Sequence, residues 1–587
     1  MRVRRFLLKP VTLAAISGVV IAGITAAVYL SMHPGIVTLK PLQEPLPAFI
    51  PVDLDAFGGS VDVTLQAVVE PTTGAELSEH TPVSSSRPGS TQLSAIPLPE
   101  RSLPVMHASL RVLLEQALEA GRMEEARMHA RQVLLEDPSD ERALVWMARF
   151  SSWEQDYETS LQLYDRLACL SPSVATYVTE KARVLGWMRR YGEALELYDA
   201  ARERFPENPE VAAESRAKRA LYNYRYRAAR KAYAAWLRLA PGDPEALFDM
   251  AQLHAGAGRF SEALELLDHL LELYPSHVMA TAVREKLRIV DGSVLARVGS
   301  ASFSSRGGER SAYLDDLHLA TMICYPFNDR FRLGVEAMGH WYGFSGEYDP
   351  DFRTFNPSIV LRYDNFPDLV LEGRVGTRYS SGELNDEPVG LLSLTSLPLD
   401  QLYLRASLGR RYVIENAETL YSSLSSDEVS GRVVFKPDRH WEVGLDGALS
   451  FYDDGNDRFA YGLDLRSHLS YEPSRLTLLW RWDVYGFGHE MAEYFTPGRF
   501  GTHRVGFEWR GYTDDERLYW GGRNTVFSLG YTMNFEPRAA RSHTIYATVA
   551  HDWSNRVSTG IGYGRTWNDE EDIYDAGRLE AGVEIFL

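Results

Sequence analysis

The stretch "HWEVGLDGALSFY", residues 440–452, decides the fold, because its side chains alternate in polarity one by one. One set is large and apolar: Trp441, Val443, Leu445, Leu449 and Phe451. The intervening set is small or charged: Glu442, Gly444, Asp446, Ala448 and Ser450. Successive side chains of a strand point to opposite faces, so this stretch predicts a strand with one apolar and one polar face. Soluble antiparallel sheets and membrane barrels both contain such strands.

Residues 292–587 contain about sixteen such segments, which favours the barrel. Examples are "RLTLLWRWDVY" at 475–485 and "RVGFEWR" at 504–510. The connections alternate in kind between short turns with proline, such as "NFPD" at 365–368, and longer acidic loops, such as "GHEMAEYFTPG" at 488–498. Tight turns on one side and long loops on the other are typical of a transmembrane antiparallel β-barrel. The prediction is about 16 strands, with a margin of two because residues 511–525 fit neither kind of connection.

Aromatic residues near the strand ends are predicted to form the girdles that lie at the two membrane interfaces. They are Trp341, Tyr342, Tyr379, Tyr452, Tyr471 and Tyr485. The last segment, "RLEAGVEIFL" at 578–587, resembles the terminal sorting signature of outer-membrane barrels. In that signature a glycine is followed by apolar residues at the third and fifth positions, here Gly582, Ile585 and Leu587.

Residues 106–291 have a different pattern, with helical spacing and a proline every 34 or 35 residues. The prolines are Pro138, Pro172, Pro206, Pro241 and Pro275. Fifteen residues before each lies Met123, Tyr157, Tyr191, Tyr226 or Phe260, and three residues further on lies Ala126, Ser160, Ala194, Ala229 or Ala263. Small residues let two helices cross closely, the aromatic residue fills the space beside them, and proline ends the second helix. The pattern predicts five helix pairs and a closing helix near 276–290, and it resembles tetratricopeptide repeats.

The N-terminal residues have the composition of an export or anchoring segment followed by a linker. Residues 1–10 are basic and predicted to be cytoplasmic, whereas residues 11–30 are apolar and uncharged. Twenty such residues are enough to cross a bilayer, so a transmembrane anchor is favoured, with a cleaved signal as the alternative. Residues 31–105 are rich in proline and serine and are predicted to be a periplasmic linker.

The composition argues against several functions. The net charge of −19 disfavours nucleic acid as a ligand. The two cysteines, Cys169 and Cys324, lie in different predicted domains, so neither a disulfide framework nor a cysteine metal site is expected.

We expect no cofactor, no metal and no catalytic residue. Ser542 and His543 are adjacent on a predicted strand, so their side chains point to opposite faces and cannot form a dyad. His254 and His269, in the repeats, have no partner at ligand spacing and are predicted to be surface residues.

The polar face of the predicted barrel carries acidic residues that line its interior. The candidates are Asp316, Glu336, Glu372, Glu442, Asp446, Asp464, Asp483, Glu508, Glu580 and Glu584. A barrel of this size can enclose an aqueous passage, and acidic rings in it attract cations. The alternative is that these acids brace the wall by pairing with inward arginines, namely Arg374, Arg466, Arg481, Arg504 and Arg510.

Taken together, residues 107–587 resemble the exopolysaccharide export porins of Gram-negative bacteria, which join periplasmic tetratricopeptide repeats to a C-terminal outer-membrane barrel. These proteins export Pel, poly-N-acetylglucosamine or cellulose. The retained N-terminal helix makes the chain most similar to the Pel exporter, although that protein has many more repeats.

The resemblance implies a non-enzymatic conduit in the outer membrane for a cationic, partly deacetylated polysaccharide. It also implies that the repeats recruit a periplasmic deacetylase, hydrolase or lipoprotein, and that the barrel assembly machinery inserts the barrel among outer-membrane lipids. Two alternatives stay open: a scaffold whose barrel does not conduct, and a barrel enzyme acting on lipid or glycan.

Overall fold

The computed structural model describes residues 104–587 with short gaps, namely 291–294, 309–310, 329, 345–351, 382–385, 415–418, 420–421, 471–473, 492–493, 495, 514–524, 537–540 and 570–574. The segments predicted at 1–10 and 11–30, and nearly all of 31–105, lie outside these residues. The described residues form two compact units, 104–219 and 220–587.

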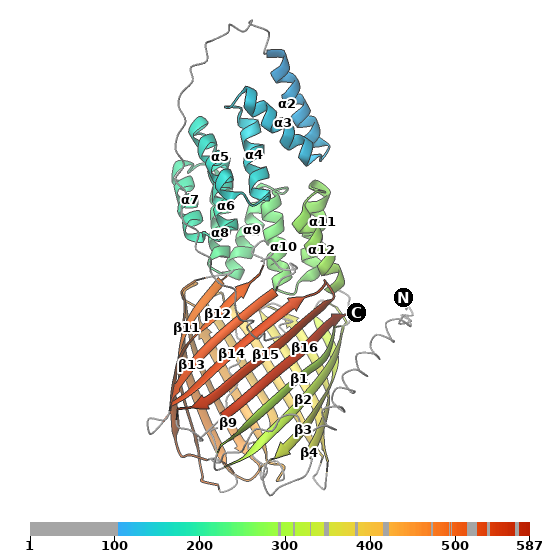
Figure 1. The fold of residues 1–587 in the computed structure, drawn as a ribbon, viewed down its shortest axis with the longest axis vertical. Helices are drawn as coiled ribbons and strands as arrows, with labels where there is room; N and C mark the ends of the chain where they lie inside the picture. The colour runs from blue at the N-terminus through green and yellow to red at the C-terminus, as the bar shows by residue number, and fades with distance from the viewer. Residues whose placement is uncertain are drawn as a thin grey trace, which may run out of the picture. The chain divides into compact units, whose positions relative to one another are not determined.

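Eleven helices occur among the described residues, followed by strands (Figure 1). The helices are α2 (Pro104–Glu119), α3 (Met123–Glu136), α4 (Glu141–Trp153), α5 (Tyr157–Leu170), α6 (Ala175–Trp187), α7 (Tyr191–Arg204), α8 (Pro209–Tyr222), α9 (Tyr226–Leu239), α10 (Pro244–Gly256), α11 (Phe260–Leu273) and α12 (Val278–Val290). They form five pairs and a closing helix, which confirms the predicted repeat solenoid. None of the helices in the described part combines the length and apolar character needed to cross a membrane.

The repeat positions occupy equivalent places in each helix pair. The aromatic column supplies the first residue of α5, α7, α9 and α11, and each repeat proline comes two residues after the second helix ends. The small residues of the column, Ala126, Ser160, Ala194, Ala229 and Ala263, are all 0% exposed. Aspartates cap α4, α5 and α10. Asp140, for example, accepts a 2.8 Å hydrogen bond from the N–H of Ala143, which satisfies a free amide of the first turn.

Buried tyrosines join successive repeats within residues 104–219. The hydroxyl of Tyr164 donates to Glu180 at 2.5 Å, and Arg149 pairs with the same carboxylate. Burial alone would raise the pKa of Glu180, but the hydrogen bond and charge of Arg149 hold it below its usual value. The arrangement recurs 34 residues later in Tyr198, Glu214 and Arg183. These buried polar groups form hydrogen bonds with one another, so they fix the relative orientation of neighbouring helices.

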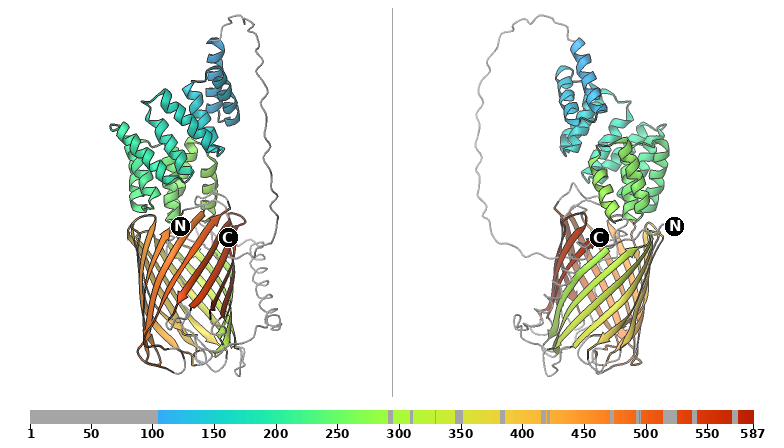
Figure 2. Two further views of the ribbon diagram at one scale, coloured as in Figure 1. Left: turned by 60° about the vertical axis from the view of Figure 1, so that its left-hand side comes forward. Right: turned by 90° about the vertical axis from the view of Figure 1, so that its right-hand side faces the viewer.

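Residues 295–586 form one closed antiparallel barrel of sixteen strands (Figures 1 and 2). The strands are β1 (Leu295–Gly308), β2 (Ser311–Pro326), β3 (Phe331–Phe344), β4 (Phe352–Asn365), β5 (Leu369–Ser380), β6 (Glu387–Leu399), β7 (Leu402–Tyr412), β8 (Ser425–Phe435), β9 (Trp441–Tyr452), β10 (Asp457–His468), β11 (Ser474–Phe487), β12 (Phe500–Tyr512), β13 (Thr525–Phe535), β14 (Arg541–Asp552), β15 (Val557–Asn568) and β16 (Asp575–Phe586). Each strand pairs with its sequence neighbour, and β1 closes on β16 through Leu295 and Phe586. The predicted strand number is confirmed.

The two ends of the barrel carry different connections. One end, called the turn end here, holds the β2–β3, β4–β5, β6–β7, β8–β9, β10–β11, β12–β13 and β14–β15 connections, and the other is the loop end. The irregular residues 511–525 include the β12–β13 connection, which is long although it joins strands at the turn end. This explains why they fitted neither kind of connection in the sequence.

The outer face of the barrel is apolar. In β9, Leu445 and Phe451 are 55% and 56% exposed, whereas Glu442 and Ser450 are 6% and 1% exposed. The same alternation recurs in other strands, with exposed apolar side chains such as Val375, which is 69% exposed. An apolar outer surface that recurs on the described strands from β2 to β16 matches the band that contacts lipid in membrane barrels.

The last repeats contact the turn end within residues 220–587. Helix α9 has no side-chain cap of its own, and Asp400 of the β6–β7 turn takes that role by accepting hydrogen bonds from the N–H groups of Arg227 at 2.7 Å and Ala228 at 3.1 Å. Arg227 in turn donates to the carbonyl of Leu397 at 2.8 Å and pairs with Asp368 at 2.7 Å.

An apolar core also connects the last repeats to the turn end of the barrel. The buried side chains of α10, α11 and α12 form one cluster with Leu295, Cys324 and Phe586 at the turn end of the barrel. The closing helix and the first and last strands therefore share a core.

Candidate functional site: the inner wall of the barrel

The inner wall of β8–β11 carries a charge cluster at mid-height. The central charge cluster consists of Arg432, Asp446, Asp464, Arg466, Arg481 and Asp483. The strand register explains why these residues meet, because Asp446 lies opposite Arg432 of β8, and Asp464 lies opposite Arg481 of β11. The even positions of β9 share the inner face with them, as the alternation of residues 440–452 predicts.

Each aspartate of the central charge cluster contacts at least one arginine. Arg481 binds Asp446 through two hydrogen bonds of 2.9 and 3.0 Å and contacts Asp483 at 2.6 Å. Asp464, whose side chain is 5% exposed, receives Arg432 at 2.6 Å and Arg481 at 3.4 Å. Three arginines of the cluster thus face its three aspartates, and two further arginines, Arg405 and Arg504, lie opposite Arg432 and Arg481 on the neighbouring strands. Buried ion pairs of this kind brace the wall, because each aspartate has an arginine that balances its charge.

A second group lies nearer the turn end. Glu442 accepts from Lys436 at 2.5 Å and contacts His468 at 3.0 Å, and His468 reaches Thr477 at 2.9 Å. These residues come from β9, β10, β11 and the turn after β8, so the group links four consecutive segments of the wall.

The remaining candidate acids also have partners where the structure describes them. Glu336 contacts Arg374 at 3.0 Å, and Glu372 lies 3.5 Å from Arg362 and 3.6 Å from Arg374. Asp316 contacts His340 at 3.0 Å, Glu508 accepts from the hydroxyl of Tyr546 at 2.9 Å, and Glu580 pairs with Arg578. Glu584 is 1% exposed on the inner face. These contacts favour the interpretation in which the acids brace the wall. Some of the paired arginines were predicted from the sequence, and others, such as Arg432, were not.

Aromatic residues fill part of the interior at the loop end. Tyr452, Tyr485 and Phe487 form a buried cluster with three residues of the loops, Val413, Leu424 and Tyr494. Arg458 lies over the ring of Tyr485 at 5.1 Å. The residues lie on the inner parity of their strands, because Tyr452 belongs to the same set as Glu442 and Asp446. The loops after β7 and β11 therefore fold against the wall.

The girdle prediction is wrong for three tyrosines. Tyr342, Tyr452 and Tyr485 are 4%, 7% and 6% exposed, whereas Tyr379 is 47% exposed. Position near a strand end was the wrong signal. The correct signal is the parity of the position along the strand, since all three tyrosines belong to the same alternating set as the inward-facing charged residues.

Ser542 and His543 have separate partners. Ser542 donates to Glu536 at 2.9 Å, whereas His543 contacts Asp569 and Tyr531. No group of histidine, cysteine, aspartate and glutamate suited to a metal ion occurs within the residues that the structure describes. His269 is exposed, as predicted, but His254 is only 8% exposed, so its prediction as a surface residue is wrong. It lies at the end of α10 between two other helices, where helical periodicity alone does not reveal burial.

Comparison with known proteins gives limited sequence similarity. No curated protein matches this chain. Among solved structures, a bacterial polysaccharide outer membrane secretin is similar over 51% of this chain and 99% of its own, with 14% identity and a TM-score of 0.42. An anion-selective porin from Comamonas acidovorans is similar over 51% of this chain and 100% of its own, with 11% identity and a TM-score of 0.29.

The helical residues have their own relatives. A thermophilic tetratricopeptide repeat protein of Thermus thermophilus is similar over 31% of this chain and 99% of its own, with 20% identity and a TM-score of 0.25. Residues 220–287 match the family model described as tetratricopeptide repeat. The helix pairs before the barrel therefore include tetratricopeptide repeats.

Proposed function

We propose that the chain is an outer-membrane porin through which a secreted polysaccharide leaves the cell, with the repeats on the periplasmic side. The observation that carries the proposal is the closed sixteen-strand barrel with an apolar outer face and a charged inner face. Barrels of sixteen to eighteen strands are wide enough to leave an aqueous channel. The wall offers hydroxyl, carboxylate and guanidinium groups, which are the partners that a sugar chain requires.

The orientation follows from the connections. The repeats precede β1, which starts at the turn end, and short turns face the periplasm in outer-membrane barrels. In this orientation the repeats lie where a periplasmic polymer-modifying enzyme, such as a deacetylase or hydrolase, or a lipoprotein would dock. Superhelical repeats present an extended concave surface suited to such partners.

The finer part of the proposal is the cargo, a cationic, partly deacetylated polysaccharide such as Pel. The family resemblance and the net charge of −19 support it. Because the aspartates of the central charge cluster are already paired, hydrogen bonds rather than unpaired negative charge would hold the polymer in that part of the wall.

Single-channel conductance of the purified chain in planar bilayers tests the proposal. An ohmic pore that a deacetylated glucosamine oligomer blocks in a concentration-dependent way is the expected result. A barrel that never conducts, even after the loops at 413–424 and 488–499 are deleted, refutes the export function.

The cluster at the loop end favours a second candidate, a scaffold protein with a closed barrel. Tyr452 and Phe487 hold Tyr494 against the inner wall, and Asn456 donates to the hydroxyl of Tyr494 at 3.2 Å. A loop fixed in this way narrows the passage. Under the scaffold function, the intact chain does not conduct, and conductance appears only when the loops at 413–424 and 488–499 are shortened.

A further inference from the structure

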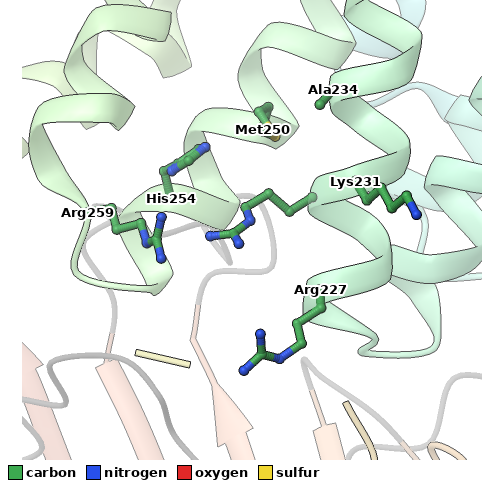
Figure 3. Close-up of a pocket in the computed structure, with 7 residues that line it drawn as sticks. Arg227, Lys231, Ala234, Met250, His254 and Arg259 are labelled. Atoms are coloured by element: carbon green, nitrogen blue, oxygen red, sulfur yellow. The ribbon is translucent and has the colours of Figure 1, made fainter. Parts of the chain in front are cut away.

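A cationic cavity lies in the last repeats, between α9, α10 and the start of α11 (Figure 3). Its volume is about 460 Å³, and its polar lining consists of Arg227, Arg230, Lys231, His254 and Arg259. Figure 3 shows Arg227 extending toward the barrel strands and Lys231 extending away from His254, so neither side chain points at the centre. Arg230, His254 and Arg259 are called the cavity triad below.

Each member of the cavity triad has a buried nitrogen without a hydrogen-bond partner among the described residues. These atoms are Nη1 of Arg230, Nδ1 of His254 and Nε of Arg259. His254 is more than nine-tenths buried, with 8% exposure. Burial lowers the pKa of this imidazole, and the charges of Arg259 and Arg230 act in the same direction, whereas the charge of Glu262 opposes them.

The charge of the cavity triad is only partly balanced. Arg259 lies 3.8 Å from Glu262 and 3.9 Å from Asp368, at the limit of ion-pair distance, and Asp368 is also the partner of Arg227. Arg230 makes no ion pair with any residue in the described part of the chain, and its guanidinium carbon lies 5.8 Å from the ring centre of Tyr226. A partly buried cation without a counter-ion is costly, because it has lost water and gained no opposite charge.

An anion of carboxylate shape completes this arrangement. Guanidinium groups bind carboxylates through two parallel hydrogen bonds, and a neutral imidazole donates one more from whichever nitrogen holds its proton. Water fills a cavity of this size but supplies no charge. We propose that the cavity triad binds a carboxylate side chain in an acidic segment of a partner protein docked on the repeats.

Two observations favour a protein over an anionic sugar polymer. A moving polymer needs weak sites that release it, whereas buried cations that lack a counter-ion hold one group in place. The cavity also has an apolar part, Ala234 and Met250, which suits the methylene groups of glutamate or a neighbouring apolar residue. The inference rests on the part of the proposed function that gives the repeats a docking role, and it names the chemistry of the partner.

The test uses the full chain in lipid nanodiscs and a fluorescein-labelled peptide of alternating glutamate and leucine, measured by fluorescence anisotropy. A peptide of alternating lysine and leucine and an unlabelled galacturonate oligomer are the comparison ligands. The variant R230Q removes a guanidinium that has no ion pair among the described residues, so the fold should tolerate it. The matched control is R238Q, an exposed arginine on the same helix. Channel conductance is recorded for each variant.

We expect the acidic peptide to bind and the lysine peptide not to bind. R230Q should weaken binding by about tenfold or more, the size expected for one charge-assisted hydrogen bond, while R238Q leaves it unchanged. R230K should fall between them, because lysine keeps the charge but loses the two-pronged geometry. The inference is overturned if the acidic peptide does not bind, or if R238Q weakens binding as much as R230Q does. It is also overturned if the galacturonate oligomer binds more tightly than the acidic peptide and displaces it. If the docking inference fails while R230Q still conducts normally, the export function is unaffected, so the two proposals can be judged separately.

Discussion

Replacement of Asp464 by asparagine gives the sharpest test of the central charge cluster. The side chain of Asp464 is 5% exposed and lies 2.6 Å from Arg432, 3.4 Å from Arg481 and 3.6 Å from Arg466. Asparagine has nearly the same shape and keeps one oxygen for the hydrogen bond from Arg432. The change therefore removes a charge without opening a cavity.

Two effects of Asp464→Asn follow from the contacts. Removing one partner of a buried ion pair costs about 3–5 kcal/mol, and the retained hydrogen bond places the expected loss near the lower limit, about 3 kcal/mol. The change also removes one of the three negative charges that face the arginines in this part of the wall. A pore should then shift its ion selectivity toward anions.

Both effects can be measured on the same preparation. Thermal unfolding in nanodiscs, followed by the infrared amide I band of antiparallel strands, gives the stability of the barrel without the signal of the helices. Reversal potentials in a salt gradient give selectivity. The matched control is Asp427→Asn on the outer face of β8, where the carboxylate is 59% exposed and 3.8 Å from Arg410. An exposed pair contributes only about 0–1 kcal/mol. Equal unfolding midpoints for the two variants refute the bracing role of the cluster.

Four further outcomes are expected. Asp400→Ala removes the cap of α9 and should lower local stability by about 1 kcal/mol, seen as faster amide exchange in the first turn of α9 but not of α11. His277 caps α12 by accepting from an N–H at 3.1 Å, and burial lowers its pKa below the usual 6.5. The unfolded chain therefore binds more protons as pH falls through 6.5, so α12 loses stability there and the loss is complete below the folded pKa. Protection factors of the α12 amides, corrected for the intrinsic pH dependence of exchange, that stay constant over this range contradict this cap. Tyr198→Phe leaves the buried Glu214 one donor short and should cost about 1–3 kcal/mol in thermal unfolding of the helices; an unchanged melting temperature rules this out. Leu445→Arg on the outer face should destabilise the barrel in lipid by about 2–4 kcal/mol, and no loss would mean that this face does not contact lipid.

The architecture could be predicted from local patterns because each pattern follows from backbone geometry. The alternation in residues 440–452 reflects the two faces of a strand, and β9 begins and ends within that stretch. The spacing of the repeat prolines likewise marks the ends of the second helices. The first signal lies within one strand and the second recurs at a fixed interval along the chain, so both are visible without knowledge of the fold.

What the sequence did not reveal depends on contacts between distant elements. Arg481 follows Asp446 by 35 positions, and only the strand register places their side chains 2.9 Å apart. The burial of His254 depends on the packing of α9 and α11 around α10. For the inward tyrosines, parity along the strand indicates the face of the barrel, and nearness to a strand end does not.

The cap on α9 connects two parts of the chain that are made at different times. Asp400 lies more than 170 positions after the amides that it caps, so α9 emerges during synthesis long before its capping carboxylate exists. Until the β6–β7 turn has formed, the first turn of that helix lacks this cap and the last repeat pairs lack Leu295 and Phe586 from their core. The last repeats, α9 to α12, therefore reach their final stability only when the barrel has closed. A partner protein that recognises the complete α9–α11 surface would then bind chains whose barrel has already closed. It would not bind chains that have not yet reached the membrane.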